Sequence, residues 1–232
     1  MEPNGSAIVT GAGSGIGQCV AHRMQAAGWR VANFDFRDES GFDYGRRLDV
    51  SDEVAVRSAV AEAESRLGPV SAVVACAGHY EEMPLESITP ETWRRMIRTH
   101  VGGVYNMMRA TLPGMAARGA GSFVTIASER ALVAAGGDTH YASAKAAALA
   151  LTRTAALEVA ARGVRVNAVA PGPTDTPLLA ADSWERQPSF TETLPARRIA
   201  HPEEVALAVV ALIEDGMFLD GGLISINSGT VM

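Results

Sequence analysis

Tyr141 and Lys145 lie four residues apart in HYASAKAAALALTRTAAL, a segment with the pattern of a helix. Side chains four apart on a helix share one face, one turn from each other. A phenol titrates near 10, so a tyrosine that acts as a base near neutral pH needs a pKa about 3 units lower, a difference of about 4 kcal/mol. A neighbouring ammonium group in a partly desolvated pocket lowers a phenol pKa in this way. The pair predicts acid/base chemistry, and the plain alternative is two ordinary surface residues.

Ser128 ends the apolar run SFVTIAS, which predicts a strand. A hydroxyl group at the end of a strand can hold the oxygen atom of a substrate beside a group that transfers a proton. We therefore place Ser128 with Tyr141 and Lys145 in one candidate catalytic group.

The sequence TGAGSGIG, residues 10–17, follows an apolar run and opens a helical pattern. Gly11, Gly15 and Gly17 let the backbone approach a ligand closely, and the free amide groups and positive dipole end of a helix attract a pyrophosphate. A glycine-rich bend without a ligand is the alternative, because glycines serve any tight turn. The strand-turn-helix setting favours a phosphate-binding turn.

Asp35 ends the second predicted strand, near the spacing of about 20 residues at which an acid accepts hydrogen bonds from an adenosine ribose. A 2′-phosphate would meet the negative charge of Asp35, and Ser14 supplies no compensating cation in the turn, although Arg37 follows two positions later. This balance favours NAD over NADP as the cofactor. A solvated acid at a strand end is the alternative for Asp35.

The elements that must position these residues alternate between short β-branched runs and longer helical patterns, which is typical of parallel crossovers. The fold class is therefore α/β, a doubly wound parallel sheet of about seven strands with helices on both faces. Helices are expected at 15–27, 52–67, after Thr89-Pro90, at 141–161 and at 202–214. Few residues separate Phe34 from Leu48, and the turn formers in DESGFDYG predict a missing or shortened helix between the second and third strands.

The length of 232 residues fits one domain, 1–232, and is too short for two domains and a linker. Segment 173–201 is rich in proline and lacks strong periodicity, with Trp184 and Phe190 as apolar anchors. Such a long segment in a compact domain is typical of a functional lid, so we expect it to cover the substrate.

The composition, 47% hydrophobic and 20% charged, is that of a folded globular domain, and the formal net charge is -6. Without a basic stripe, nucleic acid is not expected as a partner. The sequence has neither the pattern of a secretory signal nor a charge-free run of about 18 apolar residues, so no membrane span is expected. Cys19 and Cys76 form no disulfide framework, which indicates a reducing compartment and a cytoplasmic location. The histidines lack paired metal-ligand spacing, so no metal site is expected.

Together these motifs resemble those of the short-chain dehydrogenase/reductases, which have an extended Rossmann-like fold of one domain. The resemblance covers essentially the whole chain. It rests on TGAGSGIG, Asp35, Asp49 in LDVSD, ACAG at 75–78, Ser128, YASAK at 141–145, RVNAVAPGPTDTP at 165–177 and HPEEVA at 201–206.

The resemblance implies that Tyr141 is the catalytic acid/base, that Lys145 binds the nicotinamide ribose and lowers the pKa of Tyr141, and that Ser128 orients the reacting oxygen. It also implies a cofactor that lies along the ends of several strands, with the adenine, the middle of the cofactor and the carboxamide each held by a separate segment. The candidate cofactor-binding residues are Gly11, Ser14, Gly15, Ile16, Gly17, Asp35, Phe36, Asp49, Val50, Ala77, Gly78, Tyr141, Lys145, Pro171, Gly172, Thr174 and Thr176. Members of such families usually form dimers or tetramers, partly through the helix with Tyr141, so we expect a homotetramer or homodimer.

Two departures from the family pattern concern the same region. The family commonly has Asn-Ala-Gly where this chain has Cys76-Ala77-Gly78, and an asparagine where this chain has His100. The family's asparagine helps to hold a water molecule that links Lys145 to solvent. A neutral imidazole can replace it, whereas a charged imidazole would repel Lys145. Our hypothesis is a modified proton relay through His100, and the alternative is that His100 only packs in a helix kink.

The sequence thus predicts an NAD(H)-dependent oxidoreductase that interconverts a secondary alcohol and a ketone, with Tyr141 exchanging the proton. The substrate is expected to be a small or cyclic hydroxy compound, such as a dihydrodiol, a sugar or a hydroxy acid. The alternative is a non-catalytic dinucleotide-binding regulatory or scaffold protein on the same fold. Six residues that flank the motif ends are candidates for the substrate pocket: His79, Tyr80, Arg130, Thr139, His140 and Trp184.

Overall fold

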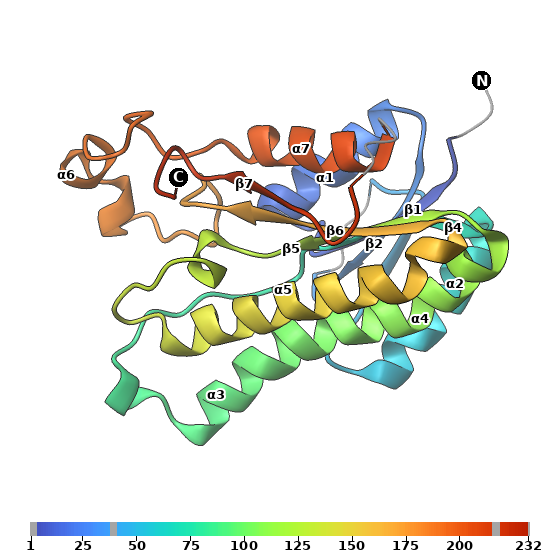
Figure 1. Cartoon of the computed structure of the whole chain (residues 1–232), viewed down its shortest axis with the longest axis horizontal. Coiled ribbons are helices and arrows are strands. Elements are labelled where there is room, and N and C mark those ends of the chain that lie inside the picture. The colour runs from blue at the N-terminus through green and yellow to red at the C-terminus, as the bar shows by residue number, and fades with distance from the viewer. Residues whose placement is uncertain (1–3, 38–40, 215–218, 232) are drawn as a thin grey trace.

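A computed structural model describes residues 4–37, 41–214 and 219–231 of the chain. In this part of the chain, seven parallel strands form one sheet in the order β3-β2-β1-β4-β5-β6-β7 (Figure 1). The strands are β1 (Ser6–Thr10), β2 (Arg30–Asp35), β3 (Tyr44–Arg47), β4 (Val70–Ala75), β5 (Gly121–Ile126), β6 (Val164–Pro171) and β7 (Leu223–Ile226).

Helices cover both faces of the sheet (Figure 1). One face carries α1 (Gly15–Ala26) and α7 (Pro202–Glu214), and the other carries α2 (Glu53–Leu67), α4 (Gly103–Arg118) and α5 (Thr139–Val159). Shorter helices are α3 (Pro90–Ile97) and α6 (Pro188–Thr191). All residues of β1 are buried, as expected for a strand covered by helices on both sides. The predicted doubly wound α/β fold is confirmed.

Local sequence signals explain where two helices begin. The Asp52 carboxylate accepts hydrogen bonds from the amides of Val54 and Ala55 and so caps α2. Thr89 forms a capping box with Thr92 at the start of α3, where Pro90 occupies the first turn.

The long helix expected after Thr89-Pro90 is interrupted. A π-helical turn, η2 (Arg98–Gly102), separates α3 from α4. Such turns insert one extra residue into a helix and occur often at functional sites. The periodicity of the sequence did not predict this insertion.

The connection between β2 and β3 is short. Residues 36–37 and 41–43 form no helix, and residues 38–40 lie outside the described part of the chain, so the missing helix is tested over only part of its span. The expected lid, 173–201, contains a short 3-10 turn η5 (Trp184–Arg186) and α6, and a bridge between Thr174 and Ala200 joins its two ends.

The strand order reverses between β1 and β4, which is where open α/β sheets bind ligands, beyond the carboxyl ends of the strands.

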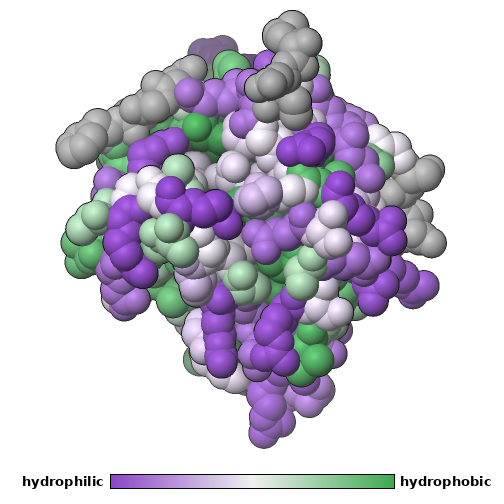
Figure 2. Space-filling model, turned by 90° about the vertical axis from the view of Figure 1, so that its right-hand side faces the viewer, coloured by the Kyte–Doolittle hydropathy of each residue, from purple (hydrophilic) through white to green (hydrophobic). Residues whose placement is uncertain are grey.

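On the opposite side of the molecule, Figure 2 shows hydrophilic and hydrophobic residues interspersed over the visible face. None of the described helices is long and apolar enough to cross a membrane.

Candidate active site

A cavity of about 600 Å³ opens beyond the carboxyl ends of the strands. The structure brings all candidate cofactor-binding residues to its wall, namely Gly11, Ser14, Gly15, Ile16, Gly17, Asp35, Phe36, Asp49, Val50, Ala77, Gly78, Tyr141, Lys145, Pro171, Gly172, Thr174 and Thr176. Ser128 and His100 line the same cavity. Residues that are far apart in the sequence therefore share one site.

The glycine turn supplies a cradle of backbone atoms. Gly11 has a φ of 72°, which favours glycine, and its amide donates to the carbonyl oxygen of Phe34 at 2.8 Å. A Cβ atom on Gly17 would lie 2.2 Å from the carbonyl oxygen of Gly11, so a side chain at position 17 would fill the turn. Helix α1 begins at Gly15 with the Ser14 side chain uninvolved in capping. Its first amides are thus available to a phosphate group, which fits a dinucleotide.

Asp35 is fixed at the end of β2. Its Oδ2 accepts a hydrogen bond from the amide of Gly13 and its Oδ1 one from the amide of Arg37, both at 2.9 Å. The carboxylate therefore faces the glycine turn with lone pairs left to accept hydrogen bonds from ribose hydroxyls.

Cys76 and Ala77 follow β4 beside the glycine turn. Their amides both donate to the Thr10 hydroxyl at 3.0 Å, which joins the ends of β1 and β4. Burial raises the pKa of the Cys76 thiol to about 11. The thiol is therefore protonated at neutral pH and is not a nucleophile there.

Ser128, Tyr141 and Lys145 lie together and are all buried. The Lys145 ammonium donates to the carbonyl oxygen of Ile126 at 2.8 Å and lies 5.6 Å from the centre of the Tyr141 ring. Burial raises the pKa of Tyr141 to about 12, an effect that the Ser128 hydroxyl opposes. Burial also lowers the pKa of Lys145 to about 8. In this state Tyr141 is a protonated phenol, ready to give a proton to a substrate oxygen.

His100 sits in the π-helical turn with only 3% of its surface exposed. Its Nε2 lies 2.8 Å from the carbonyl oxygen of His79 and 3.2 Å from the amide nitrogen of the same residue, so the His79 backbone holds it as a donor in one tautomer and as an acceptor in the other. Its ring also packs edge-on against Tyr141, with centroids 5.4 Å apart. Burial, and then the charge of Lys145, hold the pKa of His100 well below its usual value, so this imidazole is neutral at pH 7.

This geometry bears on both hypotheses for His100. Its Nδ1 is buried and has no hydrogen-bond partner among the described residues, so it is the ring atom that a water-mediated relay to Lys145 would use. The ring also fills space: a Cβ atom on Gly78 would lie 2.4 Å from Cε1 of His100. Packing is therefore observed, and the relay stays a prediction.

Three of the six candidates for the substrate pocket line the cavity, namely His79, Tyr80 and Arg130. The other three candidates do not line it. Thr139 is exposed, His140 is fully buried in the first turn of α5, and Trp184 is 53% exposed and packs on Phe190. Closeness to a motif in the sequence does not determine the direction of a side chain.

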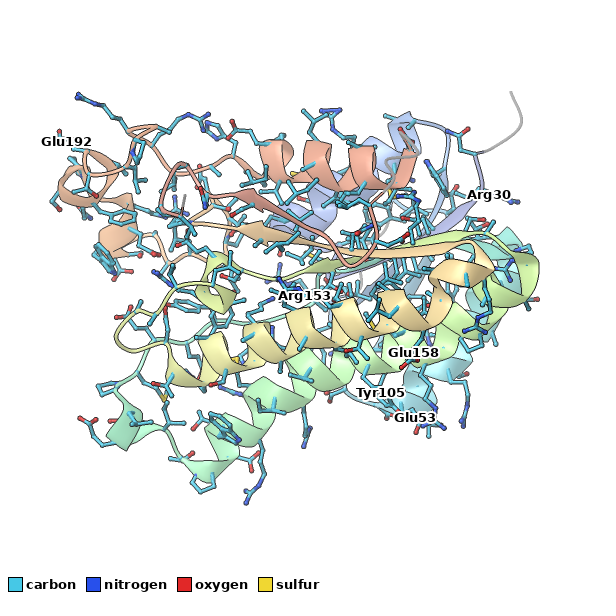
Figure 3. All side chains as sticks on the ribbon, in the orientation of Figure 1. Arg30, Glu53, Tyr105, Arg153, Glu158 and Glu192 are labelled. Atoms are coloured by element: carbon cyan, nitrogen blue, oxygen red, sulfur yellow. The ribbon has the colours of Figure 1, made fainter. Side chains whose placement is uncertain are left out.

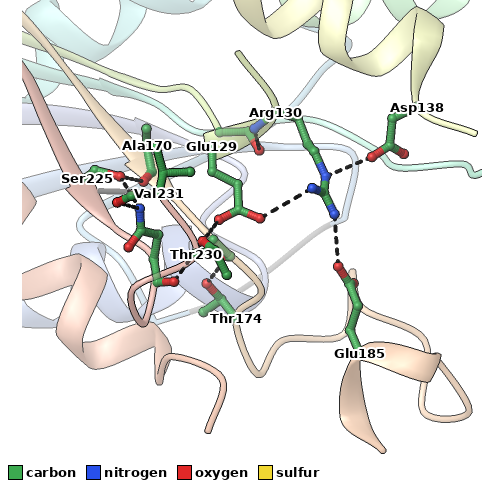
Figure 4. Close-up of polar contacts among 12 residues, drawn as sticks. Glu129, Arg130, Asp138, Ala170, Thr174, Glu185, Ser225, Thr230 and Val231 are labelled. Atoms are coloured by element: carbon green, nitrogen blue, oxygen red, sulfur yellow. Dashed lines mark hydrogen bonds and ion pairs between the residues drawn. The ribbon is translucent and has the colours of Figure 1, made fainter. Parts of the chain in front are cut away.

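Sequence reasoning missed a polar network beside Ser128, formed by Glu129, Arg130, Asp138, Glu185 and Thr230 (Figure 4). Its members come from four separate segments of the chain, so no spacing in the sequence connects them. The one available signal was the position of Glu129 and Arg130 directly after the candidate catalytic serine.

Comparison with known proteins places the chain in a family. Residues 11–230 match the family described as enoyl-(acyl carrier protein) reductase. The chain is 36% identical to acetoacetyl-CoA reductase of Rhizobium meliloti (96% of this chain, 97% of that protein) and 35% identical to cis-4-hydroxycyclohexanecarboxylate dehydrogenase of Sinomonas cyclohexanicum (96% and 95%). Its fold is similar to the crystal structure of levodione reductase, with a TM-score of 0.92, 26% identity and coverage of 99% and 98% of the two chains. The chain therefore belongs to the short-chain dehydrogenase/reductase family, as an oxidoreductase that acts on CH–OH groups.

Proposed function

We propose that this protein is an NAD(H)-dependent dehydrogenase that interconverts a secondary alcohol and a ketone. The observation that carries the proposal is one cavity with Asp35 at one end and Ser128, Tyr141 and Lys145 at the other. The glycine turn lies between them and suits the pyrophosphate of a dinucleotide.

The choice of NAD rests on the charge at the adenosine end. The fixed carboxylate of Asp35 would accept hydrogen bonds from the hydroxyl groups of an adenosine ribose and would repel a 2′-phosphate. Ser14, in the turn itself, has no charge to compensate such a phosphate. Arg37 lines the same cavity, and its positive charge opposes this preference because it would attract a 2′-phosphate.

Proton transfer is assigned to Tyr141. When a substrate alcohol is oxidised, the phenolate oxygen takes the hydroxyl proton while the Ser128 hydroxyl holds the same oxygen. The Lys145 ammonium lies 5.6 Å from the centre of the Tyr141 ring, and its positive charge favours the phenolate over the phenol. A bound oxidised nicotinamide would supply the hydride acceptor, and its positive charge would lower the pKa of Tyr141 further.

The substrate is proposed to be a small or cyclic hydroxy compound, such as a dihydrodiol, a sugar or a hydroxy acid. The names of similar proteins support a hydroxyl or keto group on a small molecule, since they include levodione reductase and an aldohexose dehydrogenase from Thermoplasma acidophilum, which has a TM-score of 0.91 and 28% identity.

We further propose a cytoplasmic homotetramer or homodimer that packs partly through α5. Leu157 on this helix is 85% exposed and would be buried by a second copy that packs on α5. Light scattering of the parent and Leu157→Asp tests this: a monomeric parent, or a variant that keeps the parent's mass, would contradict it.

The function is tested by following NADH absorbance over cyclic diols, sugars and hydroxy acids, at two pH values, with NAD⁺ and with NADP⁺. We expect turnover with NAD⁺, a loss of at least about 100-fold in Tyr141→Phe, and unchanged cofactor binding by fluorescence titration. Tyr105→Phe, on the exposed side of α4 (Figure 3), is the matched control and should keep full activity.

Asp35→Asn should reduce the preference for NAD⁺ over NADP⁺, and an unchanged preference would contradict the assignment of Asp35. Cofactor binding without turnover on any alcohol, in the parent and in Tyr141→Phe alike, would favour the scaffold alternative.

A further inference from the structure

One guanidinium group beside the catalytic residues is surrounded by three carboxylates (Figure 4). Arg130 directs Nε to Asp138 at 2.8 Å, Nη1 to Glu129 at 3.6 Å and Nη2 to Glu185 at 3.3 Å. Each nitrogen of the guanidinium therefore faces a different acid. The side chains of Glu129 and Asp138 are almost fully buried, and those of Arg130 and Glu185 are mostly buried.

This network forms part of the cavity wall next to Ser128, since Glu129, Arg130 and Glu185 all line the cavity. An arginine in such a place would ordinarily suggest a clamp for a carboxylate or phosphate of the substrate. Here the protein's own acids already occupy the guanidinium. Three acids against one arginine leave an excess of negative charge at this end of the cavity.

The other charged groups near the substrate end do not reverse this sign. Arg95 pairs with Glu81, and both side chains are partly exposed at the rim of the cavity. Arg98 also lines the cavity but is exposed, where solvent screens its charge. The Lys145 ammonium, held by the carbonyl oxygen of Ile126, offsets one of these negative charges, so the three acids still outnumber the two buried cations, Arg130 and Lys145.

The same wall offers hydrogen-bonding groups to a ligand with hydroxyl groups. Glu129 and Glu185, which line the cavity, are acceptors for such hydroxyl groups. The hydroxyl of Tyr80 already donates to Asp138 at 2.7 Å, so its own proton is not available to an anionic ligand.

We infer that this site narrows the proposed substrate classes: it selects uncharged substrates with several hydroxyl groups, of the cyclic polyol or sugar class, and disfavours hydroxy acids, whose carboxylate would meet the acidic wall. The inference rests on the proposed dehydrogenase function. It also distinguishes this chain from a relative that is named for a hydroxycyclohexanecarboxylate.

The test compares cyclohexane-1,4-diol with 4-hydroxycyclohexanecarboxylate, which differ in one group on the same ring. We expect kcat/KM for the diol to exceed that for the carboxylate by about tenfold or more, as one uncompensated charge at close range implies. Glu185→Gln should lower the ratio of the two kcat/KM values several-fold, mainly by raising kcat/KM for the carboxylate. Glu192→Gln, at the outer tip of the same lid (Figure 3), is the matched control and should leave the ratio unchanged.

Equal or better use of the carboxylate by the parent, or an unchanged ratio in Glu185→Gln, would overturn the inference while leaving the dehydrogenase function intact. Calorimetric binding of both compounds to the protein saturated with NAD⁺ gives a second readout that needs no turnover. Tighter binding of the diol supports the inference even if neither compound is oxidised, and equal binding overturns it. Absence of turnover on every alcohol would instead count against the proposed function.

Discussion

Replacing the buried His100 by asparagine should make the protein less sensitive to acid. The imidazole is almost fully buried in the π-helical turn, and burial and the charge of Lys145 keep its pKa well below 6.5. In the unfolded chain the same group titrates near 6.5. The unfolded state therefore binds more protons than the folded state below pH 6.5, and stability falls as the pH falls through this value.

The size of the effect follows from proton linkage. At pH 5.5, one unit below the pKa in the unfolded chain, protonation of His100 stabilises the unfolded state by about 1.4 kcal/mol, while the folded protein keeps the ring neutral. At pH 7.5 the same contribution is close to zero. The lowered pKa values of His79 and His140, also caused by burial, add similar effects, but these residues remain in both proteins and cancel in the comparison.

Urea denaturation of the parent and His100→Asn at pH 7.5 and 5.5 measures this difference. Between pH 7.5 and pH 5.5, the free energy of unfolding of the parent should fall by about 1.4 kcal/mol more than that of the variant. This comparison does not depend on any stability that the variant has already lost through poorer packing at pH 7.5. His201→Asn, which removes an exposed histidine, is the control and should behave as the parent does. Equal losses in the parent and His100→Asn would refute the placement of a neutral, buried imidazole at position 100.

The same variant tests the proton relay through pH-rate profiles, because identical acid limbs in the parent and His100→Asn would contradict a relay. Gly17→Ala should abolish dinucleotide binding, since its Cβ would lie 2.2 Å from the carbonyl oxygen of Gly11; retained binding by NADH fluorescence would disprove the cradle. Gly78→Ala should lower the free energy of unfolding, measured by urea denaturation, by about 1–3 kcal/mol, because its Cβ atom clashes with the His100 ring. Adding His100→Asn should restore much of this stability. Arg130→Met should lower the free energy of unfolding by about 3–5 kcal/mol at pH 7, because it leaves buried carboxylates unpaired. This loss should become smaller toward pH 5, since burial raises the pKa values of Glu129 and Glu185 and these acids then take up protons. A loss that does not depend on pH would contradict the network.

The cofactor half of the cavity could be predicted from the sequence because local patterns determine it. A glycine turn between a strand and a helix and an acid at the next strand end describe positions that the chain itself fixes. All candidate residues of this half line the cavity in the structure. The order and parallel direction of the strands followed from the same alternation of strands and helices.

The substrate half could not be predicted in the same way. Its wall depends on side-chain direction, which placed Trp184 against Phe190 instead of in the cavity, and on contacts between distant segments, such as that of Thr230 with Glu129. The π-helical turn around His100 was also invisible, because one inserted residue does not disturb the helical pattern on either side of it.

The glycine turn has a practical consequence for redesign of the protein. It would contact a bound dinucleotide through backbone groups, so this role depends on the absence of side chains, and few substitutions there would be compatible with binding. The opposite end is built from side chains of separate loops. A mutant library that varies Tyr80, Glu81, Leu178 and Glu185 and keeps residues 10–17 constant should therefore change which alcohols are accepted without loss of the cofactor.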